Sequence, residues 1–590
     1  MRKIRSEKGI TLVALVITII TLLILAGISI QTLTNQGLFS QADNAKKSTE
    51  IANIKEQINL NIYQKQLEPP LGSVTQTQLE NILSKYGTIV YEEDGATIKS
   101  IKTESGYEIL LADIYSGSYI ELQADGSWNS SKKVNSPKLM QGMTGIYWDE
   151  SGNEVTVTAD NQDNWYNYSE QKWANAKTED GSYWVWIPRY AYKITSNCNT
   201  STTGTIAVEF LQGITNKNAS GTEISKTYPT VTNNAMDDFV VHPSFTDGSK
   251  TAEEIENGAI PFGNGEWDDE IPGFWVAKYA AGFQECTQTV ESDGTVTEPT
   301  INLANVKYSD KYFTSVPWKT RNALSQTLTG SEYASTKLSY PVFKPLTYVY
   351  NVISASDSYT ISKEIANASN FYGLSSNKTD SHLIKNSEWG AVAYLTQSSY
   401  GRSGIEVKVN SKSKGNKTDN IYAVTGYAEK TANGVSASST DNKTGVFDLN
   451  GCVWEITSAY VSNGKSNLSF GKAFASLAAN ENGYKTLSTK WVTVYPYNNS
   501  SDSNTNNYNV YKSLKSATYG FGDAILETST SGSDTTAWNT DYSYFANTQY
   551  PYFYRGGMYW DGVRAGIFAS YTFEGAGTER TGFRAVLIQK

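Results

Sequence analysis

Histidine and cysteine, the residues of imidazole, thiol and zinc chemistry, are scarce in this sequence. The chain has two histidines, His242 and His382, and three cysteines, Cys198, Cys286 and Cys452. The histidines are 140 positions apart, which leaves little basis for a His-rich zinc site or a Ser-His-Asp triad. The cysteines show no CxxC spacing, which argues against a zinc ribbon, an iron–sulfur site and a disulfide-dense scaffold.

The composition instead indicates either a binding surface or a large domain with an aromatic core. The 590 residues include 40 Tyr and 14 Trp, and only 18% of the residues are charged. Tyr and Trp combined with small polar residues are typical of adaptable binding surfaces. The net charge of −10 lacks the basic footprint of a nucleic-acid binder, so we expect no nucleic-acid partner.

The N-terminus has the pattern of a membrane anchor. A basic segment at residues 1–8 precedes an uncharged apolar run, Ile10–Ile30. At about 1.5 Å per residue this run spans roughly 32 Å, which matches a hydrocarbon core of about 30 Å. The basic flank predicts a cytoplasmic N-terminus, so the bulk of the chain should lie outside the cell.

The same segment resembles the leader and first helix of type IV pilins, through the residues KGITL at 8–12. The resemblance implies cleavage between Gly9 and Ile10 by a prepilin peptidase. The family usually carries Glu at the fifth mature position, where this chain has Ala14. That Glu neutralises a neighbouring subunit's N-terminus, so export and anchoring are expected while polymerisation stays open. A generic anchor is the alternative.

The elements that follow predict an α+β fold. Ile51, Ile54, Ile58 and Ile62 recur at helical spacing, so we expect a long pilin-like helix over 10–65 after a leader at 1–9. A small α+β domain is predicted at 66–129 and a polar linker at 130–137. Residues 138–590 form a large domain of aromatic strands and Asn/Ser/Thr/Gly-rich loops.

Several motifs of the large domain together resemble the formylglycine-generating enzyme, or sulfatase-modifying, family. The resemblance implies a C-type-lectin-like fold with much irregular structure. The motifs occur in the family's order: GFWVAKYAAGF at 273–283, SVPWKTRNAL at 315–324, SHLIKNSEWGAVAYL at 381–395, GVFDLNGCVWEIT at 445–457, RGG at 555–557 and GFRAVL at 582–587.

The motif at 445–457 carries a calcium site in members of that family. The resemblance implies side-chain ligands from Asp448 and Glu455 and backbone carbonyl ligands from Gly451 and Val453. These are hard oxygen ligands, which suit calcium, and the alternative is a structural hydrogen-bond network. We also expect Arg584 of the GFR motif to pair with a buried acid.

Catalysis of the family's kind is not expected. Its oxygen-dependent members need two cysteines after the RGG motif, and the aligned positions here are Asp561 and Gly566. Cys452 lies more than 100 residues upstream, and two scattered histidines do not supply the iron ligands of the other enzymatic branch. We therefore predict a chain without enzyme activity.

The C-terminal segment resembles the variable tails of lectin-fold proteins that are diversified by retroelements. In those tails a set of fixed residues maintains the fold, and the variable side chains between them face a ligand. The alternative is that the aromatic side chains of this segment are buried in the core of the domain. We also expect Glu574, Glu579 and Arg580 at the rim. The predicted ligand-binding positions are Met558, Trp560, Asp561, Val563, Arg564, Ala569, Tyr571 and Phe573. Met, Trp and Glu codons cannot arise from an adenine-targeted Asn codon, which argues against active diversification.

Together these patterns predict a surface-anchored, non-catalytic, adhesin-like protein of the bacterial cell membrane. Its expected partners are an unknown protein or glycan ligand and the membrane, which it enters through residues 10–30. The alternatives are a minor pilin or pseudopilin that assembles with other subunits, a target of a diversity-generating retroelement, and an enzyme of the sulfatase-modifying family, which fold alone would motivate.

Overall fold

The computed structural model divides the chain into two compact units, residues 1–116 and 117–590. The apolar run 10–30, the cleavage motif at Gly9 and Ile10, and the motif at 315–324 lie outside the described residues. The structure describes residues 38–66, 76–91, 98–111, 128–129, 132–247, 267–287, 300–301, 303–313, 337–411, 413–414, 422–426, 434–461, 466–471, 473, 490–495, 498, 500–513 and 521–590.

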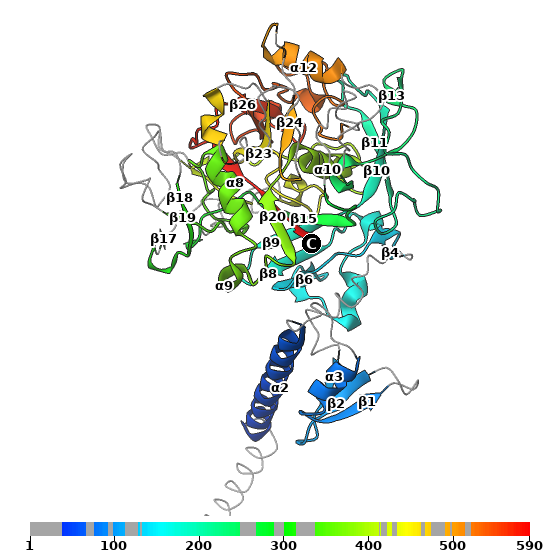
Figure 1. Ribbon diagram of the computed structural model, residues 1–590, viewed down its shortest axis with the longest axis vertical. Helices are drawn as coiled ribbons and strands as arrows, with labels where there is room; N and C mark the ends of the chain where they lie inside the picture. The colour runs from blue at the N-terminus through cyan, green and yellow to red at the C-terminus, as the bar shows by residue number, and fades with distance from the viewer. Residues whose placement is uncertain are drawn as a thin grey trace, which may run out of the picture. The chain divides into compact units, whose positions relative to one another are not determined.

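The first unit combines two helices with a three-stranded antiparallel sheet (Figure 1). Its elements are α2 (Leu38–Gln66), α3 (Gln76–Leu83), β1 (Thr88–Tyr91), β2 (Ile98–Lys102) and β3 (Glu108–Leu110). Ile101 of β2 pairs with Ile89 and Ile109, and both Ile101 and Ile109 are buried. Helix α3 and the three strands lie within the range 66–129, for which the sequence predicts a small α+β domain.

The predicted fold class, α+β with a long N-terminal pilin-like helix before a lectin-like domain, is wrong. The described chain is rich in strands, and its six α-helices are short apart from α2. The 29 residues of α2 include many charged side chains, such as Lys46, Lys47, Glu50, Lys55 and Glu56. No described helix is long and apolar enough to cross a membrane. The apolar run on which the prediction rested is not among the described residues.

A seven-stranded sheet is the largest element of the second unit (Figure 1). Strands far apart in sequence meet in it, and each of its strand pairs is antiparallel. In order across the sheet the strands are β20 (Thr379–Leu383), β28 (Ala585–Gln589), β15 (Gly273–Ala277), β9 (Tyr183–Pro188), β8 (Asn175–Thr178), β6 (Met143–Trp148) and β7 (Glu154–Thr156).

Two further sheets and four α-helices complete the main framework of this unit. The three-stranded sheet has the order β11 (Thr205–Phe210), β10 (Tyr190–Ser196), β14 (Val240–Val241). The five-stranded sheet contains β24 (Thr493–Tyr495), β23 (Trp454–Val461), β25 (Tyr552–Arg555) and β26 (Ser570–Phe573) in that order, with β27 (Thr581–Phe583) paired to β23. The helices are α8 (Ala355–Glu364), α9 (Ser369–Tyr372), α10 (Asn386–Gln397) and α12 (Asn504–Ser513).

Short two-stranded pairs occur between these elements. One strand of such a pair lies in the segment 130–137, which the sequence predicts to be a linker. Val134 and Asn135 form this strand, and Val134 is buried. Because the Asn135 amide also donates to the Gly213 and Pro272 carbonyls, these two residues are part of the packed domain and not of a linker. The pairs are β4 (Trp128–Asn129) with β5 (Val134–Asn135), β12 (Val231–Thr232) with β13 (Ala235–Met236), β16 (Cys286–Thr287) with β17 (Thr300–Ile301), β18 (Tyr308–Tyr312) with β19 (Lys337–Ser339), and β21 (Ser413–Lys414) with β22 (Tyr422–Ala423).

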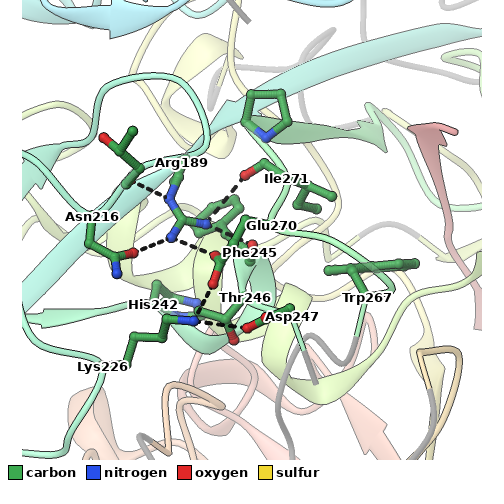
Figure 2. Close-up of polar contacts among 12 residues, drawn as sticks. Arg189, Asn216, Lys226, His242, Phe245, Thr246, Asp247, Trp267, Glu270 and Ile271 are labelled. Carbon is green, nitrogen blue, oxygen red and sulfur yellow. Dashed lines mark hydrogen bonds and ion pairs between the residues drawn. The ribbon is translucent and has the colours of Figure 1, made fainter. Parts of the chain in front are cut away.

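A buried arginine fixes the corner at which the chain passes from the seven-stranded to the three-stranded sheet. Arg189 separates β9 from β10, and Figure 2 shows its guanidinium pointing at surrounding oxygen atoms. It donates to the carbonyls of Thr215 (3.0 Å) and Phe245 (2.7 Å) and pairs with Glu270 at 2.6 Å. Lys226 bonds the same Glu270, so the buried charge is compensated at the corner.

Helix α10 is buried at every residue and lies beneath the C-terminal segment. It begins where the Lys385 backbone N–H donates to the Glu388 carboxylate at 2.9 Å. Its Gly390 allows close packing, because a Cβ there would lie 1.9 Å from the Gly522 carbonyl oxygen. The Trp389 indole donates to the Ile567 carbonyl at 2.8 Å, which ties the helix to the C-terminal loop described next.

Candidate functional site

The C-terminal segment forms a tight loop between β25 and β26. Gly556 and Gly557 follow β25 with φ of 85° and 78°, a conformation that favours glycine. The Gly556 carbonyl accepts hydrogen bonds from the backbone N–H groups of Gly451 (3.0 Å) and Gly566 (3.1 Å). Since this one oxygen closes the loop and ties it to the chain before β23, residues 558–564 are held by their backbone.

Five of the predicted ligand-binding positions lie at the surface of this loop and of β26. Trp560, Val563 and Tyr571 are 57%, 72% and 37% exposed, Arg564 is exposed and Asp561 is half-buried. Large exposed apolar side chains that lie together mark an interaction site more often than scattered ones do.

The other three predicted positions are buried, and their assignment to a surface is corrected here. Phe573 stacks on Tyr554 with ring centroids 3.7 Å apart, so it belongs to the core. Ala569 has no exposed surface, and its carbonyl accepts from the Arg555 Nε at 2.9 Å. Met558 is also buried. The core alternative therefore holds for Phe573 but fails for the exposed Trp560 and Tyr571.

Two half-buried tyrosines that the sequence reasoning missed adjoin the exposed group. Tyr542 and Tyr544 lie beside β26, since the Ser570 N–H donates to the Tyr542 carbonyl and the Tyr544 N–H donates to the Ser570 carbonyl. Their ring centroids lie 5.6 and 4.7 Å from that of Tyr571. The Tyr-Ser-Tyr alternation could have revealed them, because residues two apart share one face of an extended chain.

We call these residues together the aromatic surface: Tyr542, Tyr544, Trp560, Val563, Arg564 and Tyr571. The Arg564 guanidinium lies over the Tyr542 ring, 5.6 Å from its centroid, and donates to the Tyr542 hydroxyl at 2.9 Å. The Arg580 guanidinium lies 4.9 Å from the Trp560 ring centroid. Partial burial raises the pKa of Asp561, whose carboxylate accepts from the Met558 N–H at 2.9 Å. The surface thus combines aromatic rings with the charged side chains of Arg564, Arg580 and Asp561.

The carboxylate of Asp448, a predicted calcium ligand, is already bonded by N–H donors. It accepts from the Asn410 amide at 2.8 Å, from the Gly426 N–H at 2.9 and 3.0 Å, and from the Ala280 N–H at 3.3 Å. Asp448 is fully buried, and burial raises its pKa. This arrangement matches the alternative interpretation, a structural hydrogen-bond network.

The other predicted side-chain ligand, Glu455, forms a buried bidentate ion pair. The Arg584 Nε and Nη2 donate to its two carboxylate oxygens at 2.9 and 2.6 Å, which confirms that Arg584 pairs with a buried acid. With both carboxylates turned to N–H donors, the residues around Gly451 and Val453 do not fit a calcium ion. Among the described residues no group of three or more His, Cys, Asp and Glu side chains could hold a metal.

The two positions that align with the catalytic cysteines carry no thiol, and one has no room for a side chain. A Cβ at Gly566 would lie 2.0 Å from the Asp541 Oδ2. Asp561 occupies the other position, at the surface. Cys452 is buried, and burial raises the pKa of its thiol well above the usual value, which opposes formation of a reactive thiolate.

Introducing a cysteine at the tighter of these positions is expected to destabilise the chain. We expect Gly566→Cys to lower the free energy of unfolding by about 1–3 kcal/mol, because Cβ overlaps the Asp541 carboxylate. Urea unfolding measures the change. The double variant Gly566→Cys with Asp541→Ala should recover most of the loss, and an unchanged midpoint in the single variant would contradict the close packing.

No protein-family model matches the chain, and no curated protein is significantly similar to it.

Proposed function

We propose that this chain is a surface-anchored, non-catalytic binding protein of a bacterial cell, and that its aromatic surface contacts a protein or glycan ligand. The observation that carries the proposal is the exposure of Trp560, Val563 and Tyr571 on one loop and its neighbouring strand. Trp, Tyr and Arg are the residues most enriched where binding energy concentrates, and all three types occur here.

The support behind these side chains favours binding without a large ordering cost. Trp454 is buried beneath the surface, with its ring centroid 5.5 Å from Tyr571 and 6.0 Å from Tyr542. Rings that already pack against one another lose little conformational freedom when a ligand arrives. The Arg564 side chain is likewise held by Tyr542 before any ligand binds.

The anchoring part of the proposal rests on the sequence at residues 1–30, with its basic flank and long apolar run. The non-catalytic part rests on the aligned cysteine positions. Asp561 and Gly566 offer no thiol, and the Asp541 carboxylate occupies the space beside Gly566. The resemblance to the sulfatase-modifying family remains a prediction from the sequence motifs.

A second candidate is that the chain is a target of a diversity-generating retroelement. It is favoured by the separation between a fixed backbone and exposed side chains at 560–564. Met558, one of three residues whose codons argued against it, is buried and need not vary. A reverse-transcriptase gene beside a near-repeat of the last ~100 bases would support this candidate, and its absence would remove it.

Replacing three side chains of the aromatic surface is expected to weaken binding strongly while the fold persists. The full-length protein, in mild detergent, is applied to an array of glycans and immobilised extracellular proteins. For the triple variant Trp560→Ala, Arg564→Ala, Tyr571→Ser we expect affinity to fall by at least 2 kcal/mol, about 30-fold. The far-ultraviolet circular dichroism should not change, because all three side chains are exposed.

The matched control is Ile214→Ala, which removes an exposed apolar side chain elsewhere in the same unit. It should bind every array position that the wild type binds. Equal binding by the wild type and the triple variant would show that the ligand contacts another part of the chain.

A further inference from the structure

Two buried side-chain oxygens near the aromatic surface have no hydrogen-bond donor. They are Asp541 Oδ1 and Asn450 Oδ1, on residues that are almost completely buried. The Asn450 orientation is fixed, because its Nδ2 donates to the Val407 carbonyl at 2.6 Å. Buried acceptors without partners are rare in proteins and point to an absent ion or water.

The backbone brings the two residues that carry these oxygens close together. The Gly556 carbonyl accepts from Gly451, which follows Asn450, and from Gly566. Gly566 in turn contacts Asp541, since a Cβ on it would lie 2.3 Å from the unpaired Oδ1. Asn450 and Asp541 therefore lie on either side of one short backbone connection.

A second carboxylate adjoins the pair. The Asn450 Nδ2 donates to Glu406 Oε1 at 3.5 Å, and Glu406 is half-buried, which leaves a route to solvent. Burial and then the charge of Glu406 raise the pKa of Asp541 well above its usual value. Neither carboxylate forms an ion pair with any described residue. The charges of Arg555 on Asp541 and of Lys408 on Glu406 oppose their repulsion from beyond ion-pair distance.

We propose that Asp541, Asn450 and Glu406 form a calcium site. Two carboxylates and an amide oxygen are hard ligands, and no thiol or imidazole accompanies them, which favours calcium over zinc or copper. The ligands come from three separate loops and leave part of the site open, which suits the irregular coordination of calcium better than the octahedral demand of magnesium. This proposal does not depend on the proposed function.

The site would link the backbone beside β26 to the loop that carries Trp560 and Arg564. Asp541 immediately precedes Tyr542, and its Oδ2 already accepts from the Phe568 N–H at 3.0 Å. An ion on Oδ1 would add a second link from Asp541, to Asn450 before β23. With two carboxylates the affinity should be modest, with a Kd of about 10⁻⁴–10⁻³ M, as in extracellular calcium modules.

The test is calcium titration of the full-length protein in detergent, by calorimetry and by thermal unfolding in EDTA and in CaCl₂. We expect the wild type to bind one ion and to unfold at a higher temperature in calcium. Glu406→Gln should weaken binding at least tenfold, and Asp541→Asn should abolish it. The control Asp534→Asn removes an exposed carboxylate of the same region and should bind like the wild type.

No calcium response of the wild type at 10 mM (roughly ten times the weakest expected Kd) would overturn the site, as would unchanged binding in Glu406→Gln. Glu406 is half-buried, so its replacement disturbs the fold less than that of Asp541, and this variant keeps the test valid if Asp541→Asn does not fold. An equal response to magnesium would overturn the assignment to calcium.

Discussion

Replacing Arg584 by methionine is expected to lower the free energy of unfolding by about 3–5 kcal/mol. The loss is large because Glu455 would remain as a buried carboxylate without its bidentate partner. The carbonyls of Ala277 and Phe447 would also lose their donors, at 2.6 and 2.9 Å. Equilibrium unfolding in urea measures the change.

The matched control is Lys172→Met, which breaks an ion pair of 2.7 Å whose two side chains are largely exposed. Such surface pairs contribute about 0–1 kcal/mol, so this variant should be near wild type. The double variant Arg584→Met with Glu455→Met should recover part of the loss, since no charge then stays buried. Equal effects of Arg584→Met and Lys172→Met would contradict the buried pair.

The second large effect is a pH dependence of stability to which the two histidines contribute with opposite sign. His382 is buried between Asp380 and Glu388, with both ring nitrogens 2.9 Å from a carboxylate oxygen. Burial alone would lower its pKa, but the charge of Glu388 and these hydrogen bonds raise it above 6.5. The protonated His382 therefore adds to the free energy of unfolding. This stabilisation is fully present below pH 6.5, and it is lost as the pH rises through the raised pKa of His382.

His242 titrates in the opposite direction. Burial among Tyr190, Tyr192 and Tyr394 lowers its pKa to about 3, so it stays neutral in the folded chain. In the unfolded chain it binds a proton near pH 6.5. As the pH falls from 6.5 towards 3, stability should therefore decrease by about 1.4 kcal/mol per unit through this group.

Urea unfolding of the wild type, His242→Asn and His382→Asn from pH 4 to 9 separates the two contributions. His242→Asn should be less sensitive to acid than the wild type, and His382→Asn should be less sensitive to alkali. Each variant controls for the other, because each should change the slope of stability against pH in one range only. For His242→Asn this range lies below pH 6.5, and for His382→Asn it lies above pH 6.5. Parallel curves for all three proteins would refute both assignments.

Local patterns in the sequence predict the elements whose structure depends on neighbouring residues. The alternating aromatic runs at 183–194 and 273–283 contain β9, β15 and most of β10, because β-branched and aromatic side chains fit a buried sheet. The helical periodicity at 77–86 corresponds to α3. The segment 381–395 has Leu383, Trp389, Val392 and Leu395 at helical spacing, yet it begins in β20, where pairing with β28 overrides that spacing.

Features that depend on distant partners could not be predicted in this way. Asp448 has the residue type of a calcium ligand, but its donors come from Ala280, Asn410 and Gly426, which only the fold brings to it. The apolar run at 10–30 predicts a membrane anchor from its own composition alone. It carries no information about the fold of the strand-rich residues that follow. Phe573 could not be assigned to the core without knowing that it stacks on Tyr554.

Under the proposed binding function, the loop at 556–566 would let this chain change its specificity at little cost to its stability. The carbonyl of Gly556 and the packing of Gly557 on Ala565 hold the loop through backbone and small residues. The exposed side chains of Trp560, Val563 and Arg564 take no part in that support. Mutations at these positions can accumulate while folding is preserved, so recognition and folding can evolve separately within eleven consecutive residues.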